Sequence, residues 1–177
     1  MIIETERLYL RPIAQTDLES IWAIYGDPQT HLFNPAGPYP DIAYTQAKLT
    51  NWLAEWSRNG FGNWAISLRS APAKVIGCGG LSRRQIDETR NINLGYRFST
   101  AVWGQGLATE LALAALDYGF EQLKLPEISA TVRENHLASR RVLEKVGMHQ
   151  VGSLAEEGHK IGSAVYTIVA EKHRAMR

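Results

Sequence analysis

Residues 102–110 read VWGQGLATE and join a strand-like run of sequence to a helix-like one. Three residues with little or no side chain, Gly104, Gly106 and Ala108, occupy alternate positions in this stretch. A small-residue loop that leads into a helix leaves several backbone N–H groups unpaired, with the positive end of the helix dipole behind them. The stretch is therefore typical of a site that binds a phosphate or pyrophosphate group.

The overall composition bounds the class of protein. The chain has 177 residues, of which 45% are hydrophobic and 21% charged, and its net charge is +1. We expect one domain over residues 1–177, and no main role for nucleic acid or an anionic membrane as a partner. No segment approaches the ~18 consecutive apolar residues of a membrane span. The single cysteine, Cys78, favours a cytoplasmic location, and the scattered histidines predict no metal site.

Hydrophobic periodicity predicts a mixed α/β (α+β) fold built on one sheet, with about seven strands and four helices. The expected strands cover residues 8–12, 64–68, 74–81, 91–98, 128–132, 150–154 and 164–169. The expected helices cover residues 18–25, 41–59, 107–123 and 136–146. Residues 34–40 contain three prolines and one glycine and are expected to form a shaped loop.

The glycine-rich stretch invites three specific interpretations. A nucleoside-triphosphate loop is excluded, because Gly106 is followed by Leu107 rather than by lysine and Ser or Thr. A dinucleotide fingerprint needs a third glycine where Thr109 stands, although Glu127 lies roughly 20 residues on, where a ribose-binding acid is expected. The glycines could also simply let the helix pack tightly on the strand.

The sequence on either side of the glycine-rich stretch favours one interpretation of it. Residues 103–110 are preceded by residues 93–96 (NLGY) and followed by Asn135 and by residues 139–148 (SRRVLEKVGM). These blocks, in this order, resemble the GNAT acetyltransferases. The opening residues 5–12 (TERLYLRP) are similar to the start of the RimJ/RimL-like branch, which acetylates ribosomal-protein N-termini. The resemblance covers nearly the whole chain and implies a splayed, mostly antiparallel sheet, with acetyl-CoA in the gap between its fourth and fifth strands.

The resemblance also implies which residues bind acetyl-CoA. Phe98 and Ser99 would pair through their backbone with the pantetheine arm, and a bulge at Gly95-Tyr96 would open the gap. The CoA phosphates would be within reach of Arg140, Arg141 and Lys145. The alternative is that these three side chains only form a solvated basic face of the helix. Backbone N–H groups would bind the pyrophosphate from Gln105, Gly106, Leu107, Ala108 and Thr109.

Acetyl transfer needs a neutral amine, a polarised thioester carbonyl and a proton for the departing thiolate. Ser139 matches the family serine that could donate this proton, unless it only satisfies its own helix backbone. Asn135 resembles the family asparagine but lies one residue farther from the serine than usual, so either Asn135 or His136 occupies the expected place. The tyrosine that other branches use as the acid would fall near Val142.

The base and the acceptor site are less well defined. Asn93 stands where a glutamate often precedes Gly-Tyr, and an amide cannot take a proton. A water chain could serve instead, which favours α-amines, because their pKa lies near 8, about two units below that of lysine. The segments expected to form the acceptor site are residues 34–40, the helix with Trp52 and Trp56, and residues 83–90. The alternative for the two tryptophans is that they belong to the hydrophobic core. The polar candidates for this site are His31, Tyr39, Arg83 and Tyr96.

These observations predict an acetyl-CoA-dependent N-acetyltransferase that works by direct attack in a ternary complex. The expected acceptor is a protein N-terminal amine, and the alternative is a small amine such as an antibiotic, a polyamine or an amino-acid derivative. Two hypotheses from outside this class are a non-catalytic acyl-CoA sensor and a dinucleotide-dependent oxidoreductase. The expected partners are acetyl-CoA and the amine, and the protein is expected to be a monomer or homodimer.

Overall fold

A single eight-stranded sheet runs through the molecule in the order β1-β2-β3-β4-β5-β6-β8-β7. The computed structural model describes residues 1–34, 36–155, 158 and 161–177. Neighbouring strands are antiparallel, apart from the parallel pair β5 and β6. The strands are β1 (Ile3–Glu4), β2 (Leu8–Pro12), β3 (Asn63–Leu68), β4 (Ala71–Arg83), β5 (Ile92–Phe98), β6 (Glu127–Arg133), β7 (His149–Leu154) and β8 (Ser163–Val169).

Helices cover both faces of the sheet. Leu8, Trp64 and Leu94 share one hydrophobic cluster with the α3 side chains, whereas Ala65 and Cys78 pack with α1 and α2. Because successive strand residues point to opposite faces, these two clusters lie on opposite sides of the sheet. The helices are α1 (Leu18–Tyr25), α2 (Ile42–Asn59), α3 (Leu107–Asp117), α4 (Leu137–Lys145) and α5 (Ala170–Ala175).

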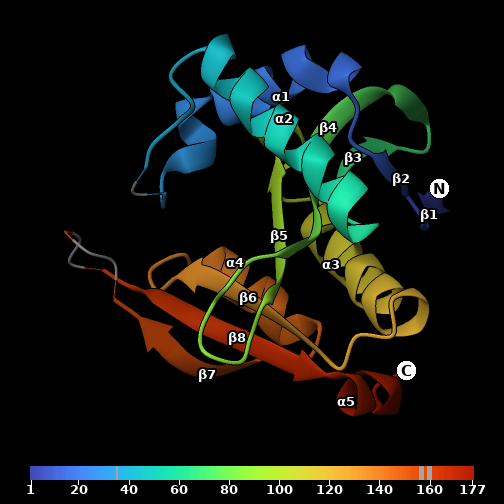
Figure 1. Ribbon diagram of the computed structural model, residues 1–177, viewed down its shortest axis with the longest axis vertical. Coiled ribbons are helices and arrows are strands. Elements are labelled where there is room, and N and C mark those ends of the chain that lie inside the picture. Colours follow the sequence, from blue (N-terminus) through green and yellow to red (C-terminus); the bar gives the residue numbers. More distant parts are fainter. Residues whose placement is uncertain (35, 156–157, 159–160) are drawn as a thin grey trace.

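The sheet is splayed between β5 and β6. These strands share one register pair, Asn93 with Ser129. By contrast, β4 pairs with β5, and β6 with β8, along seven consecutive residues each. Beyond Asn93 the two halves of the sheet diverge, as Figure 1 shows. The predicted mixed fold with a splayed, mostly antiparallel sheet is therefore confirmed.

Some predicted details need correction. The sheet gains the short strand β1, and the chain ends in α5, which gives eight strands and five α-helices among the described residues. The expected bulge at Gly95-Tyr96 is absent from the β4–β5 pairing, whose register is continuous through both residues. The helix expected over residues 107–123 changes at Asp117 into a π-helical turn, Tyr118–Gln122. This turn brings Gly119 so close to the sheet that a Cβ there would lie 2.5 Å from Ile128 Cδ1.

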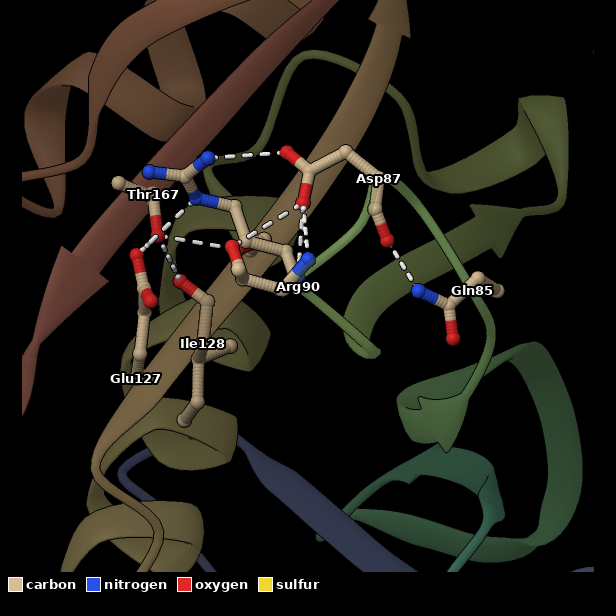
Figure 2. Close-up of polar contacts among 8 residues, drawn as sticks. Gln85, Asp87, Arg90, Glu127, Ile128 and Thr167 are labelled. Atoms are coloured by element: carbon tan, nitrogen blue, oxygen red, sulfur yellow. Dashed lines mark hydrogen bonds and ion pairs between the residues drawn. The ribbon is translucent and has the colours of Figure 1, made fainter.

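Glu127 has a structural role rather than the ribose contact of a dinucleotide fold. Figure 2 shows Arg90 between Asp87 and Glu127, with N–O distances of 2.9 and 3.1 Å. The Thr167 hydroxyl donates to the same Glu127 carboxylate at 2.5 Å. This network fixes the β4–β5 hairpin onto β6 and β8, and the mostly antiparallel sheet is not a dinucleotide-binding fold. No helix among the described residues is long and apolar enough to cross a bilayer.

Candidate active site

The start of α3 has the geometry of an anion site. Gly104 and Gly106 both have a φ of +78°, a conformation that residues with a side chain rarely adopt. Gly106 is the N-cap of α3 and provides no side-chain cap, so the first-turn N–H groups of Leu107, Ala108 and Thr109 point out of the helix end. The space beside Gly104 is open, since nothing lies within 4 Å of a Cβ built there. This cradle fits a pyrophosphate held by backbone N–H groups.

The loop before α3 is braced from the N-terminal segment. Arg7 forms an ion pair with Glu110 at 2.8 Å and donates from Nη1 to the Gln105 carbonyl at 2.7 Å. The Thr5 hydroxyl donates to the same Glu110 carboxylate. Burial raises the pKa of Glu110, but the hydrogen bonds from Thr5 and Arg7 outweigh it and lower that pKa below its ordinary value. Glu110 therefore anchors the start of α3 to the N-terminal segment, and its partner Arg7 lies in the TERLYLRP block of residues 5–12.

The residues that point their backbone groups away from β4 differ by one position from those predicted to contact the pantetheine arm. The Ser99 N–H is already bonded to the Ile76 carbonyl at 2.8 Å, which directs it toward β4. Because bonding directions alternate along a strand, Tyr96 and Phe98 point their N–H and C=O groups into the gap toward β6. The Phe98 carbonyl also accepts a bond from Trp103 Nε1 at 3.0 Å. Both backbone groups of Ser99 are thus bonded within the chain, since its carbonyl also accepts the Val102 N–H, and the outward groups at this edge belong to Tyr96 and Phe98.

The arginines at the start of α4 have different roles. The Arg140 guanidinium donates to the Tyr166 hydroxyl, the Glu134 carbonyl and the Gln150 side chain, at 2.9–3.1 Å. These bonds tie α4 to β7 and β8 and occupy the Arg140 guanidinium within the chain, which argues against its predicted contact with the CoA phosphates. Arg141 is exposed and keeps that prediction.

Tyr96 on β5 and Ser139 on α4 carry hydroxyl groups that lie near each other. The buried Tyr96 hydroxyl on β5 faces Ser139 in the first turn of α4, without the geometry of a regular hydrogen bond. Burial raises the pKa of Tyr96, and the nearby Ser139 offsets this in part, so the phenol stays protonated. His136 Nε2 lies 3.4 Å from the Ser139 hydroxyl, whereas Asn135 is exposed and its carbonyl accepts the Leu137 N–H. Of Asn135 and His136, it is the histidine that lies beside the serine.

Residues 7–149 match the model of the acetyltransferase (GNAT) domain family. The chain belongs to this family. The uncharacterized N-acetyltransferase YoaA of Bacillus subtilis (strain 168) is 28% identical over 95% of this chain and 96% of its own.

Two solved acetyltransferases have the same fold and different substrates in their names. Spermidine N-acetyltransferase of Vibrio cholerae, solved with CoA and spermine, has a TM-score of 0.78, with 21% identity over 96% of this chain and 99% of its own. Ribosomal-protein-S5-alanine acetyltransferase of Vibrio fischeri has a TM-score of 0.76, with 19% identity over 97% of each chain. This GNAT enzyme is accordingly an acetyl-CoA-dependent acyltransferase, and its acceptor has to be argued from the site.

Two of the predicted acceptor residues lie together. His31, at the end of the 3-10 turn η2 (Pro28–His31), and Tyr39 have ring centroids 5.9 Å apart, and the Tyr25 ring contacts both. Burial, with a smaller effect of the Arg97 charge, lowers the pKa of His31 to about 4. Burial raises the pKa of Tyr39 to about 12. Both side chains are therefore uncharged at neutral pH. Pro35, in the loop predicted over residues 34–40, lies outside the described residues.

The other residues predicted for the acceptor site lie apart from His31 and Tyr39. Arg83 pairs in register with Ile92, the first residue of β5, and stacks over Phe61 at 5.5 Å, so it lies at the opposite end of this strand from Arg97. There it lines a cavity of about 300 Å³ together with Arg90 and Glu127. The tryptophans are mainly core: Trp52 and Trp56 pack on the α1–α2 cluster, and Trp56 Nε1 donates to the Asn63 carbonyl.

Sequence reasoning missed Arg97, whose guanidinium lies 5.2 Å from the Tyr25 ring and donates to the Thr30 carbonyl. The available signal was an arginine inside a mostly apolar strand. It also missed Glu55 on α2, whose pKa is raised by burial and whose Oε2 has no hydrogen-bond partner among the described residues. Cys78 is fully buried, which raises the pKa of its thiol and makes it a poor nucleophile.

Proposed function

We propose that this GNAT acetyltransferase transfers the acetyl group of acetyl-CoA to a primary amine by direct attack, with a peptide N-terminal α-amine as the first candidate acceptor. The observation that carries this proposal is the buried Tyr96 hydroxyl on β5, which has no regular hydrogen-bond partner among the described residues and has Ser139 of α4 nearby. The anion cradle at the start of α3 supports it, because acetyl-CoA would bring both a pyrophosphate and a thioester.

Each group of the gap has a chemical role in this proposal. Acetyl-CoA supplies the acyl group as a thioester. The backbone of Leu107, Ala108 and Thr109 binds the pyrophosphate, and the outward N–H and C=O groups of Tyr96 and Phe98 bind the pantetheine arm. As the amine forms its bond to the acyl carbon and the C–S bond breaks, Ser139 donates a proton to the sulfur. The Tyr96 phenol, which burial keeps protonated, replaces that proton, and water takes the proton that the amine loses and returns one to Tyr96.

An α-amine suits this arrangement better than a lysine. At neutral pH a much larger share of an α-amine is uncharged, because its pKa is roughly two units lower, so water suffices as the base. The likeness to the ribosomal S5-alanine acetyltransferase agrees with a peptide acceptor. The likeness to the spermidine N-acetyltransferase makes a small amine the second candidate.

Kinetics of Ser139→Ala and Tyr96→Phe test the proton path. We expect Ser139→Ala to lower kcat by about 100-fold or more, as is typical for loss of a general acid, while the Kd for acetyl-CoA stays unchanged. Tyr96→Phe should lower kcat by a smaller factor. Ser57→Ala, which alters an exposed serine on α2, is the matched control and should match the wild type. A wild-type kcat in Ser139→Ala would rule this serine out as the proton donor.

A further inference from the structure

Two polar atoms on one face of β5 are buried and unpartnered. Asn93 Oδ1 and Arg97 Nε have no hydrogen-bond partner among the described residues. Both occupy odd positions of the strand and so lie on the same face, and Arg97 pairs in register with Cys78, which packs against α1 and α2. Buried polar groups in folded proteins are nearly always bonded, and a ligand with an acceptor for Arg97 Nε and a donor for Asn93 Oδ1 would satisfy both atoms at once.

The charge of Arg97 is not neutralised within the described part of the chain. Arg11 is paired with Asp17 and Arg90 with Asp87 and Glu127, but no described carboxylate forms an ion pair with Arg97. Its guanidinium contacts the backbone carbonyl of Thr30 and the Tyr25 ring, both of which are uncharged. A half-buried cation in such surroundings favours an anionic ligand.

Arg97 also lies close to the reacting groups. Its charge contributes to lowering the pKa of His31 on one side and of His136 on the other. His136 stacks on Phe33 with ring centroids 4.2 Å apart, and the same histidine is 3.4 Å from the Ser139 hydroxyl. The guanidinium therefore lies against the η2 segment, and the stack of Phe33 on His136 joins the residues that follow η2 to the start of α4.

The strand between the two polar residues has a bare surface. Gly95 lies midway between them and pairs in register with Gly80, so neither strand places a side chain there. The Asn93 amide extends over Gly95, since its Nδ2 lies 3.3 Å from where a Cβ would stand. Gly95 and Arg97 are both partly exposed, so a ligand can reach this surface from solvent. By strand geometry, the Cα atoms of Asn93 and Arg97 are about 13 Å apart.

We infer that the acceptor is an amine that also carries a carboxylate, which Arg97 binds while Asn93 Oδ1 accepts a hydrogen bond from the amine. The inference rests on the proposed N-acetyltransferase function and narrows its substrate class. A free amino acid and an acidic peptide N-terminus share this chemistry. A polyamine does not, because Arg97 repels its second charge.

Binding of acetylated products tests the inference without turnover. The probes are N-acetylalanine with its carboxamide, and acetyl-Ala-Glu-amide with acetyl-Ala-Gln-amide, titrated by calorimetry in the presence of CoA. We expect the carboxylate member of one pair to bind at least about tenfold more tightly than its carboxamide, and the pair that shows this preference identifies the source. Equal affinity within both pairs, or tighter binding of N-acetylspermidine than of either carboxylate, would overturn the inference.

Variants assign the preference to Arg97. Arg97→Gln should remove the carboxylate preference, Arg97→Lys should retain part of it, and Arg174→Gln, on exposed α5, should leave it intact. A carboxylate preference that survives in Arg97→Gln would contradict the inference. The comparison of carboxylate and carboxamide probes on the wild type does not depend on whether any variant folds. Thiol release is measured separately: loss of turnover with an intact preference would reject the proposed function and keep the site. Turnover with no carboxylate preference would keep the proposed function and reject the carboxylate site.

Discussion

Arg140 and Arg141 are neighbours in sequence, yet their guanidinium groups have different surroundings. Arg140 makes three hydrogen bonds inside the chain, while Arg141 is exposed on α4. Sequence could place both at the start of a helix near the predicted cofactor. It could not show that Tyr166, Gln150 and the Glu134 carbonyl converge on one of them, because those partners come from distant positions in the chain.

This difference predicts opposite effects of the two Arg→Gln changes. Arg140→Gln should lower the free energy of unfolding, because it leaves hydrogen-bond partners unsatisfied, and should not change the Kd for acetyl-CoA. Arg141→Gln should weaken acetyl-CoA binding and leave stability unchanged. Urea unfolding and calorimetry measure both quantities on both proteins. If Arg140→Gln weakens acetyl-CoA binding without loss of stability, our assignment of the two roles is reversed.

The polar residues of β5 show a second limit of sequence reasoning. The sequence marks Asn93 only as an amide where a glutamate is expected, and it gives Arg97 no distinct role. Their importance comes from what surrounds them: a glycine pair between them and no carboxylate partner for Arg97 among the described residues. Neither fact can be read from residue type or spacing alone.

At the scale of elements, the start of α3 depends on a contact from β1 and β2. The connection between these strands carries Thr5 and Arg7, which hold Glu110 in the first turn of the helix. Arg7 also holds the Gln105 carbonyl, so the phosphate loop is fixed from outside its own segment. The pairing joins residues about a hundred positions apart, and sequence patterns predict such contacts poorly.

We expect Glu110→Gln to weaken acetyl-CoA binding through this brace. The Arg7 side chain is 44% exposed, so the pair contributes modestly, and a loss of about 1 kcal/mol corresponds to a Kd raised roughly fivefold. Glu171→Gln, an exposed acid in the first turn of α5, is the control. An unchanged Kd in Glu110→Gln would mean that the loop keeps its shape without the brace.

Local periodicity predicted most elements and missed the shortest ones. The strands β2 to β8 and helices α1 to α4 follow from alternating or helical hydrophobic patterns and from caps such as Asp41, which accepts the Tyr44 N–H at the start of α2. The strand β1 has two residues, too few for a pattern. The helix α5 depends on a tertiary contact, because its buried His173 bonds Asp117 at 2.7 Å.

At the scale of the whole molecule, the splay of the sheet creates the site. Hydrophobic periodicity indicated one sheet, and the gap between these two strands was expected only from the family resemblance. The structure shows that β5 and β6 share a single register pair. The gap between them brings together the cradle of α3, the outward backbone of Tyr96 and Phe98, and Ser139 on α4. These parts are distant in sequence, so the chemistry depends on the complete fold rather than on any one motif.

The central claim is acetyl transfer to an amine within this gap, and a thiol-release assay with mass analysis of the acceptor tests it most directly. The wild type receives acetyl-CoA and a panel of N-terminal peptides, amino acids and polyamines, with acceptor-free reactions and Ser139→Ala as controls. We predict one free thiol for each acetyl group gained by an α-amine, and strongly reduced release in Ser139→Ala. Tight binding of acetyl-CoA with no thiol release for any acceptor would contradict the account and favour an acyl-CoA sensor.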